Sequence, residues 1–140
     1  MKEIKLRSAA KQEILDVTLQ VVEVVRAGGI AEGFCHLFVP HTTAGLSINE
    51  NADPDVKRDV LHALTKLVPE DGNFRHQEGN SPAHIKSVLA GCAVTLFIRA
   101  GRLDLGSWGG IYFCEFDGPR SRRLLVGGQG QDAQGRWIQF

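Results

Sequence analysis

The last third of the chain consists of short apolar runs separated by turn residues, and this pattern restricts the fold more than any other feature. The runs span residues 93–98, 102–105, 110–116 and 122–126. Ala-Gly, Gly-Ser and Asp-Gly-Pro sequences lie between them, and such sequences are typical of tight turns. The pattern predicts successive antiparallel strands arranged as a meander.

The first two thirds mix further strands with helices. Alternating or continuous apolar residues predict strands over 2–8, 33–39 and 46–49. Valines at helical spacing, followed by Gly28 and Gly29, predict a helix over 17–27. Strands and helices do not alternate in strict βαβ order. We therefore predict an α+β domain with a largely antiparallel, sandwich-like sheet and about three helices packed on it.

Proline marks the start of the other two helices. Asp53 is the expected N-cap of a helix with Pro54 in its first position, and an apolar stripe follows. Ser81 and Pro82 have the same roles in a shorter helix that is expected to end at Gly91.

The bulk properties are those of one cytoplasmic domain without a nucleic-acid or membrane partner. The 140 residues include 16 basic and 16 acidic side chains, so no overall charge attracts nucleic acid or an anionic membrane. The N-terminal MKEIKLRS does not have the apolar run of a signal peptide. Cys35, Cys92 and Cys114 form no CxxC pair, which suggests buried free thiols, with a catalytic thiol as the alternative.

The C-terminal residues 127–140 differ in composition from the rest. They are rich in Gly and Gln, so we assign 1–126 to the domain and 127–140 to a tail. Trp137, Ile138 and Phe140 could dock this tail on the domain or on a neighbouring subunit.

The first candidate site is the loop that follows Pro40. His41 could ligate a metal or move a proton, and the hydroxyls of Thr42 and Thr43 with nearby backbone amides could receive a phosphate. Alternatively, the threonines only cap the turn.

The second candidate site is the sequence Asn49-Glu50-Asn51-Ala52-Asp53. Carboxylates and amides of this kind suit Mg²⁺, which is usually held by one or two carboxylates and substrate phosphates. The N-cap role fully explains Asp53, whereas no turn or cap requires Glu50.

The third candidate site runs from Arg75 to Lys86. Asn80 and His84 lie at the start of the predicted short helix, where the N-terminus favours anions and Lys86 could add charge. Trp108 lies among glycines further on, either as the stacking wall of a pocket or as a buried indole. Zinc is not indicated by spacing alone, because His76 and His84 are eight residues apart.

Three long motifs resemble the YjbQ family, also called the secondary thiamine-phosphate synthase family. They are HTTAGLSINENADPDVKRDV, RHQEGNSPAHIKSVL and GRLDLGSWGGIYFCEFDGPRSRR, and the resemblance covers about residues 1–126. It implies a compact α+β fold, a homotrimer with pockets near subunit interfaces, and a weak thiamine-phosphate synthase activity. Where the family often has glutamine after the tryptophan, this chain has Gly109.

The resemblance also implies which residues form the site. They are His41, Thr42, Thr43, Asn49, Glu50, Asn51, Asp53, His76, Asn80, His84, Gly106, Trp108 and Glu115. The implied reaction joins a hydroxymethylpyrimidine diphosphate to a thiazole phosphate and releases pyrophosphate. Glu50, Asp53 and Lys86 would balance charge with Mg²⁺, and His84 or His76 would donate a proton or bind metal.

Two other functions stay open. His41, His76 and His84 could gather Zn²⁺ in a metal- or phosphate-binding protein or a metal-dependent hydrolase. The polar loops could instead only order a trimer interface.

Overall fold

Two antiparallel sheets form the centre of the molecule. The computed structural model describes all 140 residues. The larger sheet has the strand order β1 (Lys2–Arg7), β8 (Ser121–Gln131), β3 (Glu32–Phe38), β5 (Ala93–Arg99) and β6 (Arg102–Leu103), and β9 (Trp137–Gln139) also pairs with β8. The smaller sheet has the order β2 (Glu13–Asp16), β7 (Gly109–Glu115) and β4 (Ala44–Glu50). The predicted α+β class is confirmed.

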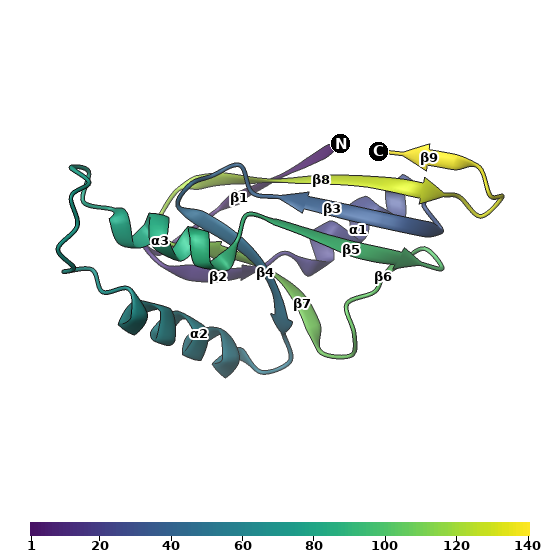
Figure 1. The fold of residues 1–140 in the computed structure, drawn as a ribbon. Helices are drawn as coiled ribbons and strands as arrows, with labels where there is room; N and C mark the ends of the chain where they lie inside the picture. Colours follow the sequence, from purple (N-terminus) through teal and green to yellow (C-terminus); the bar gives the residue numbers. More distant parts are fainter.

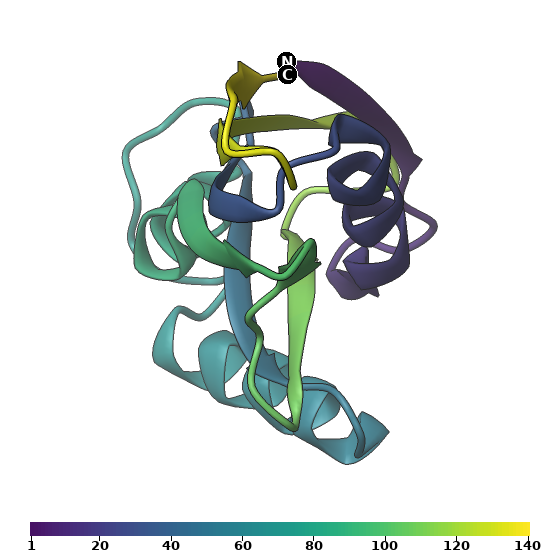
Figure 2. The same ribbon diagram turned by 90° about the vertical axis from the view of Figure 1, so that its right-hand side faces the viewer.

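Three helices surround the sheets. They are α1 (Thr18–Gly28), α2 (Pro54–Leu67) and α3 (Ser81–Ala90). Figure 1 shows the larger sheet above the smaller one, with α2 and α3 beside the smaller sheet. In Figure 2, α1 and α3 lie on opposite sides of the strands and α2 lies below them. The helices therefore do not share one face of a single sheet. None of them is both long and apolar enough to cross a lipid bilayer.

The main core lies between the larger sheet, the smaller sheet and α1. Val17, Val21 and Val25 from the start and body of α1 are buried there against Leu37, Phe113 and other apolar side chains of the two sheets. A second, smaller cluster lies on the other face of the smaller sheet. It contains Ala83 of α3, Tyr112, Cys114 and Phe116, with Leu61 and Leu64 of α2 packed against it.

The topology differs from the predicted meander. β7 joins the smaller sheet between β2 and β4, and β8 returns to the larger sheet between β1 and β3. The position of β7 explains this difference. Residues 110–115 of β7 are all buried, because one face of the strand packs in the main core and the other face packs in the smaller cluster. A strand buried on both faces fits the middle of a three-layer arrangement better than one sheet with a solvated side.

The C-terminal residues lie in the larger sheet. β8 extends to Gln131, and its glycine-rich second half pairs with β3. On its other edge, β8 pairs with β1 over residues 121–126 and with β9 over residues 129–131. Gly128 leaves room for the Phe140 ring, because a Cβ at this position would lie 2.3 Å from that ring and would displace it. The two chain ends consequently lie close together (Figures 1 and 2).

Candidate functional site

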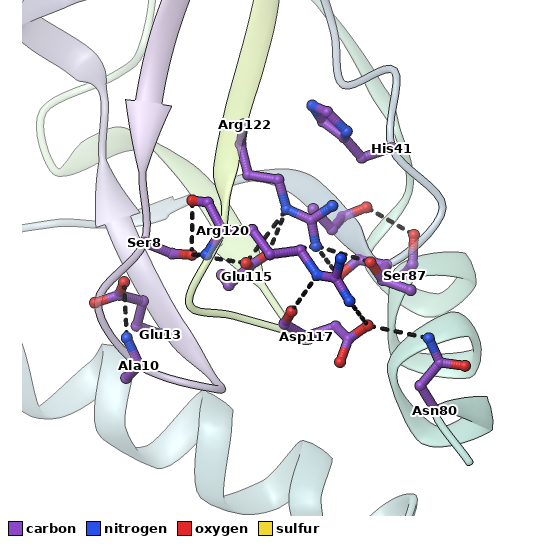
Figure 3. Close-up of polar contacts among 12 residues, drawn as sticks. Ser8, Ala10, Glu13, His41, Asn80, Ser87, Glu115, Asp117, Arg120 and Arg122 are labelled. Carbon is purple, nitrogen blue, oxygen red and sulfur yellow. Dashed lines mark hydrogen bonds and ion pairs between the residues drawn. The ribbon is translucent and has the colours of Figure 1, made fainter. Parts of the chain in front are cut away.

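Residues from four separate segments line one polar cavity of about 340 Å³ next to the start of β4. The loop before β4 contributes His41 and Thr42, and α3 contributes Asn80 and His84 around its N-terminus. The turn before β8 contributes Asp117 and Arg120, and β8 itself contributes Arg122. Figure 3 shows the two guanidinium groups side by side between Glu115 and Asn80. We call this the polar cavity.

Arg122 is held rigidly by a buried carboxylate. Its Nε and Nη2 lie 2.9 and 2.8 Å from Oε2 of Glu115, whose side chain is fully buried. Ser8 Oγ donates a 2.7 Å hydrogen bond to the other carboxylate oxygen, and Arg122 Nη2 donates to Thr43 Oγ1 at 2.7 Å. Glu115 therefore lies behind Arg122 and positions it, whereas Nη1 of Arg122 makes no hydrogen bond within the chain.

A second, more exposed network lies at the other side of the cavity. Arg120 donates from Nε to the backbone oxygen of Asp117 and from Nη2 to its Oδ2. Asn80 Nδ2 donates to the same Oδ2 at 3.0 Å, while the buried Oδ1 of Asn80 has no partner. Buried amide oxygens are normally hydrogen-bonded, so the unpaired Oδ1 of Asn80 is an exception in this network.

The protonation of His41 is set by its surroundings. The backbone N–H of Arg123 donates to its Nε2 at 3.0 Å, so a neutral ring carries its hydrogen on Nδ1. Burial lowers the pKa of His41 below the ordinary value, and the positive charges of Arg122 and Arg123 lower it further. His41 is consequently a neutral hydrogen-bond donor at pH 7.

The three histidines predicted to gather zinc do not form such a cluster within the single chain. His76 and His84 lie edge to face with ring centroids 5.4 Å apart, whereas His41 shares with His84 the lining of the polar cavity but makes no ring contact with it. His41 has no free lone pair for a metal while Nε2 accepts from Arg123. No group of three or more His, Cys, Asp or Glu side chains is arranged to hold a metal ion. The residues therefore do not fit the predicted three-histidine zinc site.

The acidic residues predicted as part of the same site lie at the other end of β4. Glu50 accepts hydrogen bonds from the backbone N–H groups of Ala52 and Asp53, and Asp53 accepts from the N–H of Asp55 as the N-cap of α2. Glu50 thus has a structural role that the sequence analysis did not assign. Asn49 accepts from the N–H of Glu50. Seven residues of strand, about 20 Å, separate this end from the polar cavity.

Asn51, Trp108 and Lys86 also lie outside the polar cavity. Asn51 Nδ2 donates to Asp16, and its buried Oδ1 has no partner. The Trp108 side chain is exposed and forms no wall of the cavity. Lys86 is fully buried, and its Nζ contacts Gln12 and Glu70 toward α2 rather than the cavity. These contacts explain why a lysine is tolerated inside α3.

Arg120, Arg122 and Asp117 were not among the residues predicted for the site, and Asp117-Gly118-Pro119 was interpreted only as a turn. A signal was present, because Arg122 alternates with Leu124 and Val126 and so occupies an inward-facing position of β8. An arginine on the buried face of a strand requires a partner, and such a partner marks a polar site.

Comparison with known proteins assigns the family. The sequence profile described as "UPF0047 protein YjbQ-like" matches residues 2–131. The chain belongs to the YjbQ family. A UPF0047 protein of Methanocaldococcus jannaschii is 46% identical over 122 residues, which are 87% of this chain and 88% of that protein. The UPF0047 protein YugU of Bacillus subtilis is 43% identical over 127 residues, which are 90% of this chain and 96% of YugU.

Solved structures of similar proteins have the same fold. A YjbQ/UPF0047 family protein from Clostridium acetobutylicum superimposes with a TM-score of 0.88 at 48% identity, covering 90% of this chain and 98% of that one. A protein from Aeropyrum pernix gives a TM-score of 0.89 at 31% identity, covering 93% and 98% of the two chains. The predicted YjbQ family membership is confirmed.

Proposed function

We propose that the polar cavity binds the phosphate or diphosphate group of a small molecule, and that the protein acts on it in a thiamine-phosphate synthase reaction. The main support for this proposal is that four side chains with N–H donors line one cavity. They are His41, His84, Arg120 and Arg122. Guanidinium and imidazole N–H groups are the usual protein donors to phosphate oxygens. The reaction type rests on the resemblance to the secondary thiamine-phosphate synthase family.

The polar cavity offers hydrogen-bond donors to a ligand but little net positive charge. Arg120 faces Asp117 and Arg122 faces Glu115, so each guanidinium is already paired with a carboxylate. Each arginine nevertheless has its Nη1 free, and His41 presents Nδ1–H. A dianionic phosphate held there is stabilised further when an imidazole takes up a proton. Binding is therefore expected to be accompanied by proton uptake.

These donors match the charge that develops in the proposed reaction. The thiazole nitrogen forms a bond to the pyrimidinylmethyl carbon as the carbon–oxygen bond to the diphosphate breaks, and the electron pair leaves with pyrophosphate. N–H groups fixed around the departing oxygens stabilise that charge without reorganising. In this proposal, His84 donates a proton to the departing pyrophosphate, and His41 donates a hydrogen bond to it from Nδ1.

Calorimetric titration with pyrophosphate tests the binding site. Wild-type protein is expected to bind pyrophosphate, while Arg120→Gln and His84→Asn weaken binding about tenfold or more because each removes a charge-assisted donor. Arg99→Gln is the matched control, since Arg99 is an exposed arginine paired with Asp104 outside the cavity. Equal affinity in all four proteins would refute the site.

A direct assay tests the reaction. Purified protein is mixed with hydroxymethylpyrimidine diphosphate and thiazole phosphate, and thiamine phosphate and pyrophosphate are both quantified. Both products should appear in equal amounts and should fall together in His84→Asn. Pyrophosphate binding without product formation would keep the phosphate site and reject the synthase reaction.

The alternative is a metal-dependent hydrolase, favoured by the proximity of His76 and His84. Two imidazoles are one ligand short of the three that catalytic zinc sites usually have, and no third His, Cys, Asp or Glu side chain of the chain completes a metal-binding group with them. Elemental analysis after dialysis decides between the two functions. Near-stoichiometric zinc that is lost in His76→Asn supports the hydrolase.

A further inference from the structure

A second cavity of about 720 Å³ adjoins the polar cavity and is largely apolar. The two cavities share Pro40, His41, Thr42 and His84. Beyond this shared wall, the second cavity is lined by the end of β3 and the residue after it, by α3, and by the turn that follows α3. These residues are Phe38, Val39, Ser87, Val88, Gly91 and Cys92. We call it the apolar cavity. Neither Arg120 nor Arg122 lines it.

We propose that the apolar cavity binds the organic body of the ligand whose phosphate group lies in the polar cavity. This inference rests on the proposed function and adds to it a separate subsite with its own specificity residues, Phe38 and Val88. The ligand class is a phosphate ester that carries an apolar, ring-sized group. The exposed Trp108 at the far end of β4 has no part in holding that group.

The surface of α3 supports a ligand on this side. The helix buries Lys86 and Ser87 against the domain, while Val88 and Leu89 are 82% and 54% exposed. A surface helix normally turns its apolar residues inward. The neighbouring residues Leu37 and Phe38 of β3 point to opposite faces of the sheet. Leu37 is buried in the core, whereas Phe38 is 44% exposed. Val88 and Phe38 thus present apolar surface at the same cavity.

The distribution of charge fixes the orientation of the ligand. The arginines lie only on the polar side, because Arg120 and Arg122 line the polar cavity and the apolar cavity has no arginine or lysine in its wall. A phosphate placed there would lose its hydration without partners. The volume is in the range of about 300 to 1,000 Å³ that small-molecule sites usually have. His41 and His84 lie at the boundary, where the phosphate joins the organic group.

Phenyl phosphate and methyl phosphate test the subsite, because they differ only in the size of the apolar group. Calorimetry should give phenyl phosphate an affinity about tenfold higher or more, from burial of the ring. Val88→Asn should remove most of this preference and leave pyrophosphate affinity unchanged. Leu89→Asn is the matched control, since Leu89 is exposed on the same helix but does not line the cavity. Phe38→Ser and Phe34→Ser form an equivalent pair on β3.

Cys92 supplies a second readout. It is an exposed thiol in the wall of the apolar cavity, whereas burial raises the pKa of Cys35 to about 11 and that of Cys114 to about 12. An aryl disulfide reagent should therefore modify Cys92 alone in the folded protein. Phenyl phosphate should slow this modification several-fold, and pyrophosphate should leave its rate unchanged.

The outcomes separate this inference from the proposed function. Equal affinity for the two esters, with pyrophosphate still bound, rejects the apolar subsite and keeps the phosphate site. Absence of binding of pyrophosphate and of both esters rejects the two together. If Val88→Asn changes the mass of the assembly in sedimentation but not the preference for phenyl phosphate, a second copy of the chain covers this surface and the inference is overturned.

Discussion

Both ends of β4 are rich in polar residues, but the two ends use them differently. At its start, Thr43 and His41 contact groups from β8, more than 75 residues away in sequence. At its end, Glu50 and Asp53 bind backbone N–H groups within three residues of themselves. Local partners fold a turn and cap a helix, whereas distant partners build a cavity. The comparison shows that a dense polar sequence becomes a site only when folding brings other segments to it.

The largest expected effect is on stability at the start of β4. Arg122→Ala leaves the fully buried Glu115 carboxylate without its counter-charge, which should cost about 3–5 kcal/mol of unfolding free energy. Replacing both residues by apolar ones, as in Arg122→Met with Glu115→Leu, should recover most of that loss. Urea unfolding measures both variants. A loss under 1 kcal/mol in Arg122→Ala would show that the pair does not organise this end.

The second effect separates the two ends by function. Asp53→Ala removes the N-cap of α2 and should lower the unfolding free energy by about 1 kcal/mol, with pyrophosphate affinity unchanged. His84→Asn should do the reverse, with little change in unfolding and weakened binding. If Asp53→Ala weakens pyrophosphate binding as strongly as His84→Asn does, the two ends work at one site, and an assembly of chains must bring them together.

The third and smallest effect is a pH dependence that belongs to the cavity end alone. Because the pKa of His41 is lowered in the folded protein, the unfolded chain binds more protons below pH 6.5. Stability from this group is therefore present above pH 6.5 and is lost as the pH falls below it. Urea unfolding at pH 5 and pH 7.5 should show a smaller decrease for His41→Gln than for wild type. His62→Gln, which removes an exposed imidazole of α2, should behave as wild type.

Anion binding should reverse the shift of His41. A diphosphate in the polar cavity places negative charge near the imidazole, so the pKa of His41 should rise toward or above its ordinary value. NMR titration of the histidine signals with and without pyrophosphate measures this change. An unchanged His41 titration alongside measurable binding would place the anion elsewhere.

The elements with strong local signals were predictable from sequence. Asp53 and Pro54 fix the start of α2 through side-chain capping and a preset backbone angle, and the structure confirms both. The third helix begins one residue earlier than predicted, with Asn80 rather than Ser81 before it. β2 was not predicted, because its four residues follow a polar loop and gain their stability from pairing with β7. Such tertiary pairing leaves little trace in local sequence.

The candidate site was half predictable for the same reason. His41, Thr42, Thr43, Asn80 and His84 stood out because they follow a strand or begin a helix, and the structure brings them together. The arginines did not stand out, because their role depends on β8 crossing back between β1 and β3. The structural role of Glu50 was missed because a carboxylate that closes a turn and one that binds a ligand look alike in sequence.

The continuation of β8 past Val126 determines how far the chain can be shortened. Residues 127–131 supply the hydrogen-bonding partners of Glu32 to His36 in β3. A chain cut at Val126 would leave that stretch of β3 with unpaired N–H and C=O groups next to the exposed Phe34. Open strand edges of this kind recruit strands from other molecules, so the shortened protein would tend to aggregate even though all its site residues are still present.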